Sequence, residues 1–113
     1  MKVLRYKEKG TPDNLVYEEV AEPKADAGQV KIEVQNTGVN YLDILILAAR
    51  YKARQTMPIT PSAETNGIVV EVGEGVTDLA VGDRVTAHQI IGGFAEYVLC
   101  HVKTGCCKRM FAI

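Results

Sequence analysis

Residues 61–85 constrain the fold of this chain more than any other stretch. Within them, the apolar side chains of Ile68, Val70 and Val72 recur at every second position, which is the period of a half-buried β-strand. Two glycines follow within residues 73–75, and glycine adopts the positive φ of a tight turn without a Cβ clash. This part of the chain therefore predicts a strand that ends in a tight turn.

The rest of this stretch predicts the same alternation of short strands and turns. Residues 76–81 would return across the sheet, Gly82 and Asp83 would form a second turn, and a further strand would start at Arg84. We expect other strands at residues 1–6, 15–20, 30–34 and 94–98. Many short strands joined by glycine turns indicate a mainly β fold, either an irregular, partly open β-barrel or a sandwich.

Residues 40–51 predict the main helix of the chain. Asn40 is a favourable N-cap residue, and Asp43 suits the positive end of the helix dipole. Four apolar side chains follow the 3.6-residue period and predict one buried face: Leu42, Leu45, Ile46 and Ala49. Ile44 and Leu47 lie outside this face, so the helix is apolar over more of its circumference than an ordinary surface helix.

The composition predicts one globular domain without a strongly charged partner. The chain has 113 residues and a net charge of −1, which gives no reason to expect binding to nucleic acid or to an anionic membrane. Its longest apolar run, residues 44–49, is far too short to span a bilayer. Three clustered cysteines and the lack of a signal-peptide pattern indicate a reducing compartment, so we expect a cytoplasmic location.

Three motifs connect the chain with a known family. Residues 64–85 match the pattern E-x-x-G-x-V-x-x-V-G-x-G-V-x-x-x-x-x-G-D-R-V. Residues 30–43 are similar to V-x-V-x-V-x-x-x-G-V-N-x-x-D, and residues 92–98 to G-G-x-A-E-Y-V. With these motifs, residues 1–98 resemble the GroES-like N-terminal domain of the medium-chain dehydrogenase/reductase superfamily. The resemblance implies a GroES-like, partly open β-barrel with one main helix at about residues 40–51.

Residues 99–113 depart from the family pattern and form an atypical tail. The family continues here towards a dinucleotide-binding Rossmann domain, which we expect to be absent, as in a truncated or frameshifted product. The only glycine-rich candidate for a phosphate loop, residues 73–78, has Asp78 at the place of the third glycine and leads into no helix, so we interpret it as a hairpin turn.

The cysteines and histidine of the tail lack the spacing of a zinc site. Cys100, His101, Cys106 and Cys107 lie close together in the sequence, but no C-x-x-C pair is present. In the zinc alcohol dehydrogenases, which resemble this chain, a cysteine and a histidine bind the catalytic metal at the positions of Asn40 and Ala63. An asparagine and a methyl group cannot replace them, so we expect no metal.

Asparagine at position 40 resembles the zinc-independent quinone oxidoreductases, which reduce quinones or activated alkenes with NADPH. This resemblance implies that Asn40 and Tyr51 lie at the nicotinamide pocket and contact both cofactor and substrate. The alternative is that Asn40 only caps the helix and Tyr51 only borders the core. The chain departs from the family at Leu45 and Leu47, which replace a common Tyr and Arg, and at Ser62, which replaces a Gly.

Two classes of function follow from this comparison. In the first, the chain is the substrate-side domain of an NADPH-dependent quinone oxidoreductase-like protein and is inactive alone, with no bound cofactor, because the cofactor-binding domain is missing. In the second, it is a stand-alone GroES-like module that works by binding or assembly. The apolar helix predicts a homodimer formed through the helix surface, an open sheet edge or the tail. The alternative is that the tail folds back and covers this surface within one chain.

Overall fold

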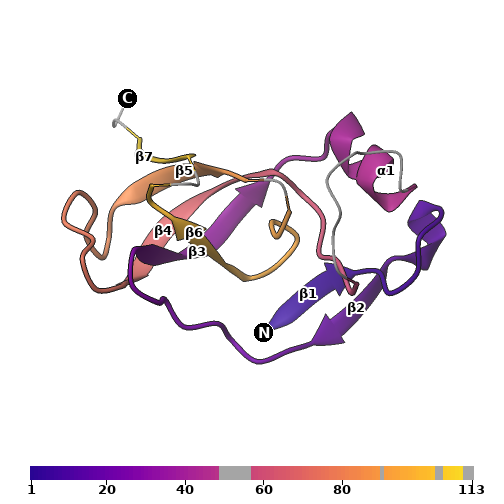
Figure 1. Cartoon of the computed structure of the whole chain (residues 1–113), viewed down its shortest axis with the longest axis horizontal. Helices are drawn as coiled ribbons and strands as arrows, with labels where there is room; N and C mark the ends of the chain where they lie inside the picture. Colours follow the sequence, from indigo (N-terminus) through magenta and orange to yellow (C-terminus); the bar gives the residue numbers. More distant parts are fainter. Residues whose placement is uncertain (49–56, 90, 104–105, 111–113) are drawn as a thin grey trace.

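A computed structural model describes residues 1–48, 57–89, 91–103 and 106–110 of the chain. The elements in these residues are β1 (Lys2–Arg5), η1 (Pro12–Asn14), β2 (Val16–Glu19), β3 (Gln29–Thr37), α1 (Tyr41–Leu47), β4 (Glu64–Val72), β5 (Arg84–His88), β6 (Tyr97–His101) and β7 (Cys106–Arg109). Figure 1 shows the β1–β2 hairpin and α1 at one end of the molecule and the other strands at the opposite end. No helix among the described residues is long and apolar enough to cross a membrane.

The strands form two antiparallel sheets. β1 pairs with β2, and the larger sheet has the order β6-β3-β4-β5-β7. In the described part of the chain this sheet curves around a core but does not close, because β6 and β7 remain its two edges. The expected fold class, a mainly β, partly open GroES-like barrel with one main helix, is therefore confirmed.

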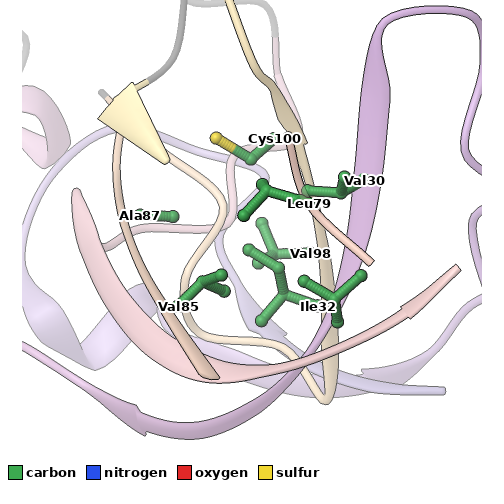
Figure 2. Close-up of a cluster of buried hydrophobic side chains, with 8 residues drawn as sticks. Val30, Ile32, Leu79, Val85, Ala87, Val98 and Cys100 are labelled. Atoms are coloured by element: carbon green, nitrogen blue, oxygen red, sulfur yellow. The ribbon is translucent and has the colours of Figure 1, made fainter. Parts of the chain in front are cut away.

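The concave side of the larger sheet holds one hydrophobic cluster, which we call the sheet core. Figure 2 shows its side chains pointing towards one another inside the curved sheet. The sheet core consists of Val30, Ile32, Val69, Leu79, Val85, Ala87, Val98 and Cys100. Leu79 comes from the loop between β4 and β5, so the expectation that residues 76–81 return across the sheet is wrong. The loop instead inserts one side chain into the core and closes through a hydrogen bond from Gly82 N to Val69 O (2.8 Å).

A bulge in β4 changes which of its side chains face the core. Lys31 of β3 pairs with Glu71, but Ile32 pairs with Val69, so Val70 is an extra residue in β4. The alternation of Ile68, Val70 and Val72 therefore does not mark the buried face, since Val69 is fully buried and Ile68 and Val70 are only half-buried. Val72, beyond the bulge, does pack against the sheet core.

Lys31 is buried although it points away from the sheet core, because it alternates on β3 with the core residues Val30 and Ile32. Its Nζ lies 2.5 Å from Glu22 Oε1, 3.3 Å from Glu71 Oε2 and 5.3 Å from the centre of the Tyr97 ring. The hydrogen bond to Glu22 is the main cause that raises the pKa of Lys31 above its ordinary value. This contact fastens the polar connector before β3 to the outside of the sheet.

The helix packs on a second cluster, the helix core, which consists of Tyr6, Ile46, Leu47 and Ile59. α1 begins at Tyr41 as expected, and the described helix ends at Leu47; residues 49–51 of the expected helix lie outside the described residues. The buried face also differs from the expected one. Leu47 is buried, whereas Leu45 is half-buried and does not join the helix core.

Part of the tail completes the larger sheet. β7 pairs with β5 from Val85 opposite Arg109 to His88 opposite Cys106. Arg109 donates hydrogen bonds to Asp83 Oδ2 through Nε (3.1 Å) and Nη2 (2.9 Å). In Figure 1, β7 lies far from α1, so the described part of the tail does not cover the helix surface.

Gly67 sets the distance between β3 and β4. A Cβ atom at this position would lie 2.0 Å from the backbone oxygen of Glu33, which cannot move without breaking the pairing of the two central strands. We therefore expect Gly67→Ala to lower the free energy of unfolding by about 3 kcal/mol or more. Urea denaturation followed by circular dichroism measures this loss.

Gly75→Ala is the matched control for this experiment. Gly75 has a φ of +84° but no atom within 4 Å of the added Cβ, so this substitution should cost only about 1–2 kcal/mol of backbone strain. A Gly67→Ala protein as stable as the wild type would contradict the observed strand spacing.

Candidate functional site

The candidate site is a polar cluster where α1 begins. Asn40 occupies the N-cap position with an extended backbone (φ −126°, ψ 162°). Its backbone N–H donates to Asp43 Oδ2 (2.8 Å), which is the return bond of a capping box. Its side-chain Nδ2 donates to Glu64 Oε1 (2.7 Å). The predicted capping position of Asn40 is confirmed, and the amide has a second connection that the sequence did not indicate.

Asp43 connects the helix with the start of β4. Its side chain is buried, and its second oxygen, Oδ1, accepts a hydrogen bond from the backbone N–H of Ser62 (3.0 Å). A buried carboxylate needs such donors, because an unpaired buried charge is strongly unfavourable. Asp43 therefore fixes the helix start against the segment that carries Glu64.

Ser62 is a fully buried residue with an unusual backbone conformation. Its φ is +86°, a region that side chains other than glycine rarely adopt. Its hydroxyl donates to the backbone oxygen of Gly38 (2.8 Å) and lies 2.6 Å from Thr37 Oγ1. These contacts hold the end of β3 against the residues that precede β4, directly beside Asn40.

An open surface cavity of about 290 Å³ lies next to this cluster. Its lining is polar apart from one glycine: Asn36, Thr37, Gly38, Glu64, Thr65, Asn66 and Thr86. Asn36 Nδ2 donates to Asn66 Oδ1 (3.1 Å), so part of its hydrogen-bonding capacity is used within the protein. Glu64 belongs both to this cavity and to the contact with Asn40.

Of the two predicted site residues, the structure describes only Asn40. Asn40 is exposed at the helix start, whereas Tyr51 lies outside the described residues. Leu47, one of the departures from the family pattern, is buried in the helix core and does not face the site. Sequence reasoning gave no role to Glu64 or Ser62, although Ser62 in place of a glycine was a visible signal.

The structure adds one observation on metal binding. Within residues 1–48, 57–89, 91–103 and 106–110, no group of three or more His, Cys, Asp or Glu side chains could hold a metal ion. Ala63, at the position of the expected histidine ligand, is a buried methyl group that is 3% exposed.

The fold and this cluster define a GroES-like β domain whose polar site lies at the start of its helix. The sequence profile of the alcohol dehydrogenase GroES-like domain matches residues 26–110 of the chain. The chain therefore belongs to the alcohol dehydrogenase GroES-like domain family.

Relatives of the chain include oxidoreductases. The quinone oxidoreductase of Lama guanicoe is 39% identical over 101 residues, which are 88% of this chain and 31% of that protein. A probable oxidoreductase from Mycobacterium abscessus superposes with a TM-score of 0.85 and 33% identity, over 93% of this chain and 33% of that one. A mycobacterial protein in complex with NADPH gives a TM-score of 0.83 and 27% identity, again over 93% and 33%. The chain thus spans about a third of the length of these proteins.

Tyr6 brings a titratable group close to the site. Its side chain is fully buried, and its hydroxyl has no hydrogen-bond partner among the described residues. Burial, and secondly the negative charge of Asp43, raise the pKa of Tyr6 above its ordinary value of 10.0. The hydroxyl is therefore kept neutral without contributing a hydrogen bond within the described part of the chain.

We expect Tyr6→Phe to leave the free energy of unfolding at neutral pH unchanged or to raise it by up to about 1 kcal/mol, because no described partner is lost. Because the pKa of Tyr6 is raised, the unfolded chain loses this proton at a lower pH than the folded chain, so stability falls as the pH rises from 10.0 to the folded-state pKa. This loss of stability above pH 10.0 should be smaller in Tyr6→Phe.

Urea denaturation at a series of alkaline pH values measures both effects. The raised pKa of Lys31 leaves part of the alkaline slope in place in either protein. A clear loss of stability in Tyr6→Phe at neutral pH would show that the hydroxyl does have a partner.

Proposed function

We propose that this chain is the substrate-side domain of an NADPH-dependent, zinc-independent quinone oxidoreductase-like protein of the cytoplasm. The observation that carries the proposal is the side-chain amide of Asn40, which Glu64 holds at the start of α1. Relatives of the chain are named quinone oxidoreductases, and a similar structure contains NADPH, which supports this assignment.

In this proposal, Asn40 and Tyr51 contact the nicotinamide end of the cofactor and the carbonyl group of a quinone or enone. NADPH supplies the hydride when it is bound. The amide of Asn40 offers a donor and an acceptor, and the carboxylate of Glu64 accepts from its Nδ2 and so restricts its rotation. These residues orient the ligands and need no proton transfer of their own.

The described residues offer no binding site for the pyrophosphate of NADPH. The glycine-rich turn after β4 leads through a loop into β5, not into a helix, and so lacks the backbone N–H groups that bind pyrophosphate. The hydrophobic side chain of Leu79 in this loop is buried in the sheet core. Binding and orientation of the whole cofactor would therefore require a second domain, and the isolated chain should be inactive.

We expect the purified chain to leave NADPH unconsumed in the presence of menadione, because the nicotinamide is not fixed within reach of the acceptor. Reduced nicotinamide mononucleotide at millimolar concentration should nevertheless shift the NMR signals of the Asn40 side-chain amide. NADPH absorbance and ¹H–¹⁵N spectra provide the two measurements.

Asn40→Ala should abolish the response of the surrounding backbone signals, and Glu74→Ala, in the exposed turn after β4, should retain it. Consumption of NADPH above the buffer rate would show that the isolated chain is active. A wild-type spectrum without changes around Asn40 would contradict its role as a ligand-binding residue.

One observation favours the second candidate function, a stand-alone module that assembles. Three apolar side chains near the start of α1 are exposed: Val39 (76%), Tyr41 (69%) and Ile44 (49%). Removing such a surface from water contributes about 25 cal/mol per Å², so a second copy of the chain could bind there. We propose a homodimer that uses this apolar patch.

Sedimentation velocity at tens of micromolar protein tests the dimer. Ile44→Glu should convert the dimer into a monomer, because the charge would be buried in the interface. Val81→Glu is a suitable control, since Val81 is 66% exposed and lies in the loop after β4, away from α1. A wild-type protein that sediments only as a monomer would rule out the dimer.

A further inference from the structure

We propose that Ser62 and Glu64 are positioning residues that fix the side-chain amide of Asn40 for its ligand. The proposal rests on the proposed function of Asn40 and adds the residues through which the fold controls it. Neither side chain needs to touch the ligand, because both act through hydrogen bonds within the protein.

Glu64 determines which way the amide of Asn40 faces. A carboxylate only accepts hydrogen bonds, so the NH₂ end of the amide is the end that can lie 2.7 Å from Glu64 Oε1. The carbonyl end of Asn40 must then point away from this carboxylate. The ligand therefore meets the amide in one of its two possible orientations.

Ser62 fixes the backbone that carries Glu64. Its hydroxyl bonds to Gly38 O (2.8 Å) and lies 3.3 Å from Glu64 O, while its N–H donates to Asp43 (3.0 Å). Asp43 in turn accepts from the backbone N–H of Asn40 (2.8 Å). One buried residue thus connects the helix start, through its backbone N–H, with the start of β4, through its hydroxyl.

The surroundings of Ser62 leave no room for an alternative arrangement. A Cβ atom added at Gly93 would lie 2.6 Å from Ser62 Oγ and 2.7 Å from Thr37 Oγ1, so the backbone of Gly93 closes directly over the two hydroxyls. Gly93 N also donates to Ser62 O (3.1 Å). Glycine would adopt the φ of +86° more easily than serine. The benefit of a serine at this position therefore lies in the contacts of its hydroxyl.

Ser62→Gly separates positioning from folding, because glycine accepts this backbone conformation and the substitution removes only the CH2OH side chain that makes the hydroxyl contacts. We expect the variant to fold with a similar melting temperature. The hydrogen exchange of the Asn40 side-chain amide should become about five- to tenfold faster, and the affinity for reduced nicotinamide mononucleotide should fall about fivefold, which corresponds to one lost hydrogen bond.

Glu64→Gln should have the same direction of effect, because glutamine can present a donor to the amide and no longer fixes its orientation. The matched control is Glu74→Gln, an exposed residue in the turn after β4, which should change neither reading. ¹H–¹⁵N spectra of the full chain give the exchange rates and the affinities.

The proposal is overturned if Ser62→Gly lowers the melting temperature and leaves the Asn40 amide signals and their exchange unchanged, since Ser62 would then only stabilise the fold. The amide signals report positioning without any ligand. A wild-type chain that fails to bind the mononucleotide would therefore refute the proposed function of Asn40 while the effect of Ser62 on the amide could still be observed.

Discussion

The close pairing of β3 with β4 is the constraint on which the rest of the structure depends. At Gly67 the two backbones approach so closely that no side chain fits between them. This pair forms the centre of the larger sheet, with β6 on one side and β5 on the other. The sheet core lies along one half of the pair, and the polar cluster around Ser62 lies where the pair ends. The same pairing therefore sets both the packing of the core and the geometry of the site.

Local patterns predicted most of the strands, because alternation and glycine turns depend only on near neighbours. β5 begins at Arg84 after the Gly82 turn, as expected, and β3 ends before Gly38. The inward face of β4 could not be predicted in this way, because one extra residue at Val70 reverses the alternation. Neither could the burial of Lys31, which depends on a carboxylate from a separate segment.

Only the part of the site that is encoded by neighbouring residues could be predicted from the sequence. The N-cap preference and a family motif both identified Asn40, since each is encoded within a few residues. Its contact with Glu64 spans 24 positions and follows from the register of β3 with β4, which the sequence alone does not specify. The role of Ser62 likewise depends on a backbone conformation that only the folded chain reveals.

The two separate hydrophobic clusters have a consequence for the dynamics of the site. Asn40 and Asp43 move with α1, whose apolar face packs on the helix core, whereas Ser62 and Glu64 lead into β4, which packs on the sheet core. Proteins open locally in contiguous cooperative units that often coincide with supersecondary motifs. The hydrogen bonds of the site cross the boundary between two such units, so local opening of either one is enough to dismantle it. The hydrogen bonds of the polar cluster therefore couple the local stability of one unit to that of the other.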